Sequence, residues 1–273
     1  MIRPTLGRVG IAAAALALPL GLAAVPAQAA DMATVSVLHA IPEGAGADVV
    51  DVFANGDLLI DNFTPGTLET VEVPAGTYDL AVFGDGQTPD DAEPVLAAEA
   101  VEVPGGANAT VTANLDAEGA PALNVFVNDI SAMAAGESRL IVRHIAAAPA
   151  VDVLADGTVI FADVTNPNEG AVVVPAGDYE AAVNLAGTDT TVLGPAPLML
   201  DEGTVTIAYA WGSAEEENLA LATQVITDLS TGPEGVPAGG GSTQQLPLMA
   251  FGIAALGALA IAGAGARLAA TRR

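Results

Sequence analysis

Between residues 33 and 229, apolar and polar residues alternate in short runs separated by turns. Thr34–Ala40 is such a run, and Val49–Phe53 follows it after a loop rich in Pro and Gly. Alternation with a period of two places successive side chains on opposite faces of a strand. Asn55-Gly56 favours a tight hairpin leading into the short strand Leu58–Ile60. Further strands are expected at Thr70–Val73, Tyr78–Val82, Val95–Val103, Ala109–Leu115 and Leu123–Val127. Short strands with frequent turns predict an all-β protein of the sandwich or barrel kind.

The chain contains an internal repeat. The motif Val73–Tyr78, which reads Val-Pro-Ala-Gly-Thr-Tyr, recurs as Val174–Tyr179 with Asp in place of Thr. Pro fixes φ and Gly tolerates turn geometry, so both copies predict a strand end, a tight turn and a new strand. Val50–Gly56 recurs at the same spacing as Val151–Gly157. Two copies with a long period indicate a duplicated domain rather than a solenoid.

The repeat defines two domains, residues 33–130 and 138–229. Leu140–His144 matches the first strand, and Thr204–Thr206 matches Thr110–Thr112, which implies a shorter acidic loop in the second copy. The predicted fold is two tandem β-sandwiches, of the immunoglobulin-like or transthyretin-like kind.

Both ends of the chain have the composition of membrane-targeting segments. Residues 1–30 combine two Arg, an apolar run and a small-x-small site, which predicts a signal peptide cleaved near Ala29 or Ala30. Residues 230–245 are rich in Gly, Pro and Ser and predict a flexible linker. Residues 246–266 carry no charge and are long enough for a transmembrane helix. The tail, residues 267–273, contains three Arg and is expected in the cytoplasm.

The chain is strongly acidic. It has 33 Asp and Glu residues against seven Arg and no Lys, and only Arg139 and Arg143 lie between the two termini. Such a charge repels nucleic-acid backbones, which excludes nucleic acid as a partner. A solvated acidic shell suits solubility in salt, and cation binding or steering toward a basic partner is the alternative. The absence of Cys excludes disulfides and thiolate chemistry.

These motifs resemble a known family. Val37–Ala40, Val50–Gly56 and Val73–Tyr78 in that order are similar to the DUF4397 domain, a bacterial extracytoplasmic domain of unknown function. The second copy shows the same resemblance through Arg143-His144 and Ala148–Gly157. It implies a fold and a location outside the cytoplasm, and no activity.

The overall layout also resembles sortase-anchored wall proteins. The Leu-Pro-x-Thr-Gly motif is absent, because Leu246-Pro247 continues as Leu248-Met249-Ala250. Retention by the membrane helix is therefore favoured over covalent attachment to the wall.

The only two histidines, His39 and His144, end matching strands, and each precedes a matched acid, Asp51 or Asp152. A functional interpretation makes each His–Asp pair a metal or catalytic element. A zinc site, however, needs three or four ligands, and one His per domain without Cys supplies too few. No Gly-x-Ser-x-Gly elbow or phosphate-binding loop is present either. We therefore expect packed, hydrogen-bonded histidines and no catalytic residue.

The acidic loop between Gly84 and Glu93 is a weaker candidate site. Asp85, Asp90, Asp91 and Glu93 could offer oxygen ligands to Ca²⁺, although their spacing is not that of an EF-hand. A solvated loop is the favoured interpretation, and no cofactor is expected.

Together these features predict a single-pass membrane protein with both β domains outside the cell. Its expected role is non-catalytic: adhesion, envelope structure, or binding of a surface protein or glycan. Two alternatives stay open, a hydrolase acting on envelope material and a calcium-stabilised surface spacer.

Overall fold

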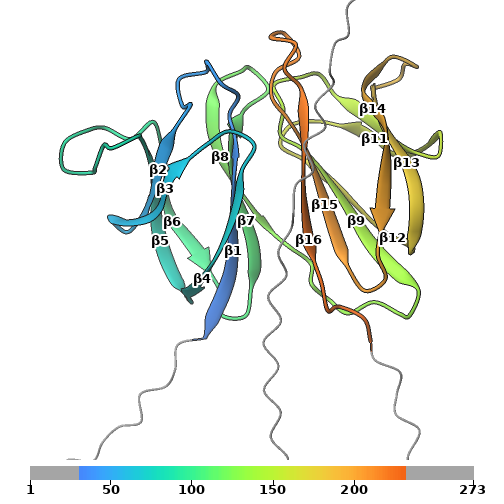
Figure 1. The fold of residues 1–273 in the computed structure, drawn as a ribbon, viewed down its shortest axis with the longest axis horizontal. Coiled ribbons are helices and arrows are strands. Elements are labelled where there is room, and N and C mark those ends of the chain that lie inside the picture. The colour runs from blue at the N-terminus through green and yellow to red at the C-terminus, as the bar shows by residue number, and fades with distance from the viewer. Residues whose placement is uncertain (1–30, 232–273) are drawn as a thin grey trace, which may run out of the picture. The chain divides into compact units, whose positions relative to one another are not determined.

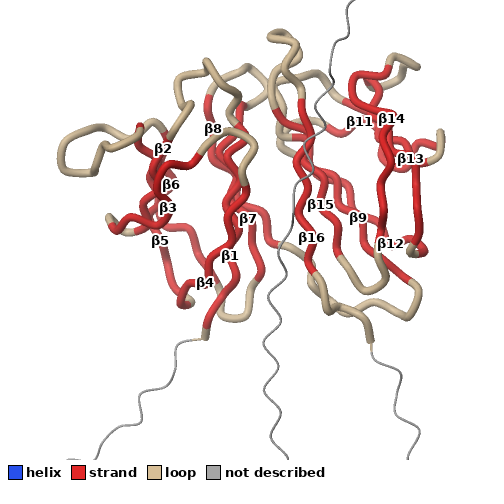
Figure 2. Tube along the Cα trace, viewed as in Figure 1, coloured by secondary structure: helices blue, strands red, loops and turns tan. Residues whose placement is uncertain are grey.

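Strands account for all of the regular secondary structure in the part of the chain that the structure describes. The structure is a computed structural model and describes residues 31–231 (Figures 1 and 2). No helix occurs in that range, so the prediction of an all-β protein is confirmed.

The first half of the described chain forms two four-stranded sheets. Their orders are β4-β1-β7-β8 and β3-β2-β5-β6. Neighbouring strands are antiparallel except β1 and β7, which are parallel. The strands are β1 (Met32–Ala40), β2 (Val50–Ala54), β3 (Asp57–Phe63), β4 (Leu68–Pro74), β5 (Gly76–Gly84), β6 (Leu96–Val103), β7 (Asn108–Leu115) and β8 (Pro121–Val127).

The second half repeats this topology. Its sheets have the orders β12-β9-β15-β16 and β11-β10-β13-β14, with β9 and β15 parallel. Each strand takes the position of the strand eight places earlier, so the internal repeat is present in three dimensions. The strands are β9 (Glu137–His144), β10 (Val151–Ala155), β11 (Thr158–Val164), β12 (Glu169–Pro175), β13 (Gly177–Leu185), β14 (Thr191–Leu200), β15 (Val205–Trp211) and β16 (Ala220–Ile226).

Two-residue turns join β2 to β3 and β10 to β11. Asn55 and Gly56 have φ of 53° and 85°, and Asp156 and Gly157 have φ of 48° and 72°. Two consecutive positive φ values characterise the type I′ turn, whose twist matches that of the flanking strands. The predicted Asn-Gly hairpin is confirmed, and the second half has its counterpart.

The Val-Pro-Ala-Gly-x-Tyr motif is where the chain crosses between sheets. β4 pairs with β1 in one sheet, whereas β5 pairs with β2 and β6 in the other. The Tyr78 hydroxyl donates a hydrogen bond to the Pro74 carbonyl at 2.6 Å, and Tyr179 does the same to Pro175 at 2.7 Å. As expected, one strand ends and another begins at this motif, and the tyrosine hydrogen bond stabilises the crossover.

An apolar core lies between the two sheets of each half. In the first half Val35 and Val111 from one sheet pack in one buried cluster with Val52 and Val82 from the other. β5 and β13 alternate as expected, with one row of side chains more buried than the other over their first residues. Burying a Val or Ile side chain stabilises a fold by about 1.5–3 kcal/mol, so these clusters are the main stabilising element of each half.

The central strands of the sheets that contain β1 and β9 are buried on both faces. We call these two sheets, β4-β1-β7-β8 and β12-β9-β15-β16, the inner sheets. Nearly every residue of β1, β7 and β9 is buried, so the alternation of polar and apolar residues in β1 does not leave one row facing water. The reason is a third apolar cluster, in which Leu38 and Phe126 of the first half pack with Ile141, Ile207 and Tyr209 of the second.

Over the last strands of the two halves, the structure pairs equivalent residues differently from the match that the sequence suggested. His39 lies opposite Ala113, and His144 lies opposite Ala210. Counting back three residues along β7 and β15 makes Ile207, rather than Thr204, the counterpart of Thr110. The loop after β13 is still shorter than the loop after β5, but by fewer residues than the Thr-Val-Thr match implied.

Several predictions fall on residues that the structure does not describe. The signal peptide (1–30), the transmembrane helix (246–266), the tail (267–273) and most of the linker (230–245) lie outside the described range. Ser230 and Thr231, the first two linker residues, are held by a strand bridge and a hydrogen bond to Met133. Residues 31–231 include no helix that is long and apolar enough to span a membrane.

Candidate functional site

His39 lies at the end of β1 with both ring nitrogens bonded to the backbone. It is fully buried, and Nε2 donates to the Ala47 carbonyl at 2.7 Å. Nδ1 accepts a long hydrogen bond from the Ile41 amide at 3.4 Å. A carbonyl can only accept, so the proton is on Nε2 and the ring is neutral. Burial is the main reason that the pKa of His39 lies below its usual value of 6.5.

His144 repeats this arrangement in the second half. Nε2 donates to the Pro149 carbonyl at 2.9 Å, and Nδ1 accepts from the Ala146 amide at 3.3 Å. Burial again lowers its pKa. Each histidine therefore fastens the loop that follows its strand, and the backbone occupies both nitrogens that a metal ion would need. The expectation of packed histidines bonded to the backbone agrees with this geometry.

Asp51 and Asp152 accept hydrogen bonds from backbone amides, and neither forms a hydrogen bond with a histidine in the described structure. The two carboxylate oxygens of Asp51 accept from Asn62 at 2.9 Å and from Gly86 at 2.8 Å. Asn62 has a φ of 55° and lies where the pairing of β2 and β3 is irregular. Asp51 thus ties the irregular part of β3 to the loop after β5.

Asp152 does the same in the second half. It accepts from Asp163 at 2.9 Å and from Gly187 at 2.8 Å, and these two bonds lower its pKa. The sequence suggested the His–Asp pairs as possible catalytic or metal elements. In the structure the His and the Asp of each pair instead act separately, and each holds backbone groups in place.

The carboxylates of the acidic loop after β5 do not form a cluster that could hold a metal ion. Asp85, Asp90, Asp91 and Glu93 are all exposed. Asp91 accepts a hydrogen bond from the Thr88 amide within the loop. Within residues 31–231 no three His, Asp or Glu side chains lie close enough together to hold a metal ion. The loop is consistent with the solvated acidic loop that the sequence favours.

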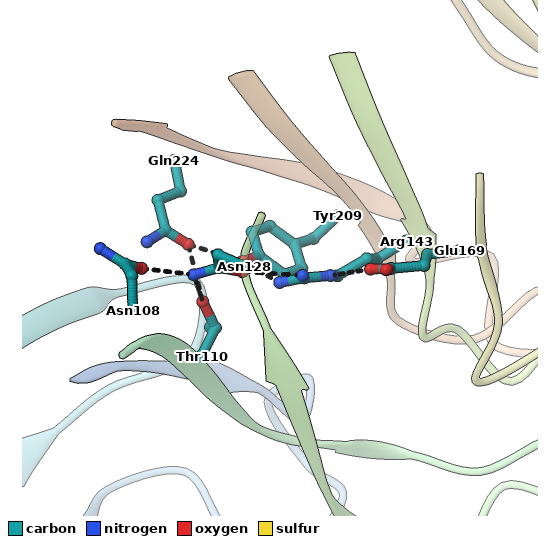
Figure 3. Close-up of polar contacts among 7 residues, drawn as sticks. All are labelled: Asn108, Thr110, Asn128, Arg143, Glu169, Tyr209 and Gln224. Atoms are coloured by element: carbon teal, nitrogen blue, oxygen red, sulfur yellow. Dashed lines mark hydrogen bonds and ion pairs between the residues drawn. The ribbon is translucent and has the colours of Figure 1, made fainter. Parts of the chain in front are cut away.

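The buried Arg143 joins the two halves and was not singled out from the sequence. Its side chain is 0% exposed. Nε donates to Glu169 at 2.7 Å, Nη1 to the Tyr209 hydroxyl at 3.0 Å and Nη2 to Asn128 Oδ1 at 2.8 Å. The guanidinium carbon also lies 4.3 Å from the centre of the Phe126 ring, which adds a cation–π contact. Asn128 and Phe126 belong to the first half, so one guanidinium bonds across the interface (Figure 3).

From Arg143 a chain of hydrogen bonds runs between the inner sheets. The Tyr209 hydroxyl donates to Gln224 Oε1 at 2.6 Å, and Thr110 donates to the same oxygen at 3.0 Å. Gln224 Nε2 donates to Ser36 Oγ at 3.0 Å. Burial raises the pKa of Tyr209, which keeps the phenol protonated as a donor. Figure 3 shows Asn108 and Thr110 beside Asn128, and Thr110 and Asn128 bonded to Gln224 and Arg143 of the second half.

A sequence signal for this network exists. Arg143 interrupts the apolar strand Leu140–His144 in a region with only one other Arg. The facing rows of β1 and β7 carry Ser, Thr and Asn without any charge, in a chain where acids are otherwise frequent. An isolated Arg in an apolar strand, together with an uncharged polar strand face, indicates an internal polar contact.

Comparison with known proteins finds a family match for part of the chain and leaves the activity open. Residues 33–154, from β1 through most of β10, match the model described as "Domain of unknown function (DUF4397)". No curated protein matches the chain. Among solved structures, a match is "The Bacillus anthracis TIE protein", with 11% sequence identity and a TM-score of 0.20. It covers 65% of this chain, which spans only 33% of that structure, and a likeness this weak carries no functional argument. Residues 33–154 therefore match the DUF4397 domain, as the ordered motifs of this part of the chain indicated.

Proposed function

We propose that the protein is a non-catalytic binding or structural module of the cell surface. In this proposal the two halves are tandem sandwich domains of the immunoglobulin-like or transthyretin-like kind. A signal peptide exports them, and the helix at residues 246–266 tethers them to the membrane with the basic tail in the cytoplasm. The role is adhesion, envelope structure, or binding of a surface protein or glycan.

The observation that carries this proposal is how the repeated polar residues are used. His39, His144, Asp51 and Asp152 all bond to backbone groups of loops or irregular strands. Residues used in this way fix loop conformation, and fixed loops on a β scaffold are a common basis for binding surfaces.

The bonds between the halves support the same role. Arg143, Gln224 and the shared apolar cluster hold the inner sheets together. A tethered body whose two parts are fixed to each other presents its loops in one arrangement, which lowers the entropy cost of binding.

Proximity labelling on intact cells tests the proposal. The labelling enzyme is fused near Asp31, at the expected mature N-terminus. The control carries the same enzyme on residues 230–273 alone, which keeps the linker, helix and tail and omits both halves. Lysine-reactive cross-linkers are unsuitable because the chain contains no Lys.

Reproducible enrichment of one or a few surface proteins over the control is the expected result. Labelling that matches the control would contradict partner binding. Release of soluble fragments from purified envelope material by the protein would instead establish the hydrolase.

A further inference from the structure

The second half has an open edge between β14 and β16. These strands end the two sheets of that half, so each is paired along one side only. A cavity of about 110 Å³ lies inside, and its apolar lining includes Leu140, Val153, Ile160, Leu198, Ala208 and Leu221. The equivalent strands of the first half, β6 and β8, are in contact, and the cavity beside them is about 40 Å³. The larger opening is therefore a property of the second half.

Both strands at this edge expose apolar side chains. Leu221 and Val225 of β16 are 46% and 55% exposed, and Met199 of β14 is 67% exposed. Neither strand contains a charged residue. Exposed edge strands are usually protected by charges or covered, because their free amides and carbonyls pair readily with another strand. An uncharged edge beside an apolar cavity is suited to receiving such a strand.

Acidic residues lie at both ends of this edge. Asp201 and Glu202 follow β14 and Asp228 follows β16. The Leu229 amide donates to the Gly203 carbonyl at 2.9 Å, which places these strand ends together. At the opposite end, the exposed run Glu215–Glu217 precedes β16. The edge thus has an uncharged middle and negatively charged ends.

We propose that β16 is a docking edge for an extended peptide segment with an apolar centre and basic residues at both ends. The segment adds as a strand along β16, and one of its apolar side chains enters the cavity beside Leu221. One basic end faces the acids that follow β14 and β16, and the other faces Glu215–Glu217, which precede β16. This inference rests on the proposed binding function and names the partner chemistry and the surface.

A synthetic peptide, Lys-Lys-Val-Thr-Val-Thr-Val-Lys-Lys, serves as the probe in fluorescence anisotropy titrations with the purified protein. One control peptide carries Glu at the four terminal positions, and another carries Ser in place of each Val. We expect binding of the first peptide only, with an affinity that falls as salt is raised because salt screens the end contacts.

Leu221→Lys should weaken binding about tenfold or more, because a charge at the cavity mouth opposes both apolar insertion and the basic peptide. The matched control is Leu58→Lys on β3, which is 53% exposed and lies in the first half. Both leucines are exposed, so neither substitution disrupts the core, and the control should bind like the unaltered protein.

Equal binding by the two variants would overturn the assignment to β16. Equal binding of the Glu-ended peptide would overturn the charge requirement, and no binding of the probe would overturn the inference as a whole. Proximity labelling is independent of these titrations, so a partner found there while the probe fails would reject this docking edge and leave the proposed function standing.

Discussion

Replacing Arg143 tests whether the buried polar layer holds the two halves together. Arg143→Met keeps much of the side-chain length and removes the charge and all three hydrogen bonds. The change leaves Asn128 Oδ1 without its donor and Glu169 without its ion pair. Tyr209 keeps its hydrogen bond to Gln224, so the rest of the polar layer stays hydrogen-bonded.

The expected loss follows from these contacts. Breaking a buried ion pair costs about 3–5 kcal/mol. The Glu169 side chain is 36% exposed and water can solvate it after the change, so we expect about 2–4 kcal/mol for Arg143→Met. Arg143→Lys should lose less stability than Arg143→Met but should still be less stable than the unaltered protein, because an ammonium on a flexible stem cannot reach three separated acceptors as the guanidinium does.

Arg139→Met is the matched control. Arg139 lies on the same strand, but it bonds to Asp129 and Ser131 in the segment between the halves, and its ion-pair partner is 61% exposed. We expect about 1 kcal/mol for this change. Urea denaturation monitored by Trp211 fluorescence and by circular dichroism measures both losses.

The two probes should also separate in Arg143→Met, because weaker contact between the halves lets one unfold before the other. A loss no larger than that of Arg139→Met, with coincident transitions, would refute the role assigned to Arg143.

The remaining predictions concern the repeated residues. Because burial lowers the pKa of His39 and His144 below 6.5, the unfolded chain binds protons first; stability should be complete above about pH 6.5 and fall as the pH is lowered below that value, and His39→Gln should reduce this dependence. An unchanged free energy of unfolding below that pH would count against the assignment. Tyr78→Phe should cost about 1 kcal/mol through the hydrogen bond of its hydroxyl to the Pro74 carbonyl, and an unchanged stability in urea denaturation would show that this bond does not stabilise the crossover between the sheets. Asp51→Ala should cost about 2–3 kcal/mol, more than Asp152→Ala, because Asp51 is 4% exposed and its two hydrogen bonds are partly buried, whereas those of Asp152 are exposed to water. Ca²⁺ at matched ionic strength should leave the melting temperature unchanged, and a clear rise would revive the calcium-stabilised spacer.

The sequence predicted the strands and hairpins well because those depend on neighbours along the chain. Asn55-Gly56 determines its turn through backbone conformations that few residues adopt, and Thr34–Ala40 alternates whatever lies beyond it. The histidines were also anticipated, since a His that ends an apolar row has few alternatives to a backbone partner.

The contact between the halves could not be predicted in this way. Ser36 and Thr110 have the spacing of residues that face water, and only the second half shows that they face Gln224. The position of Arg143 in an apolar strand indicates an internal contact, but its partners Asn128 and Glu169 come beside it only in the folded structure. Partners so distant along the chain leave only a weak local trace, which is the absence of charge on the facing strands.

The burial of the two arginines determines how one copy of the protein meets another. Arg139 is 8% exposed and Arg143 is 0% exposed, and they are the only Arg or Lys residues in the range 31–231. The surface of this range therefore carries negative charge with almost no positive charge to pair with it. Through the surface of residues 31–231, two copies side by side cannot form the lateral salt bridges that cluster many surface proteins, and each attracts a layer of mobile counterions. Dense display on a membrane would space the copies apart by mutual repulsion, at distances that shrink as ionic strength rises.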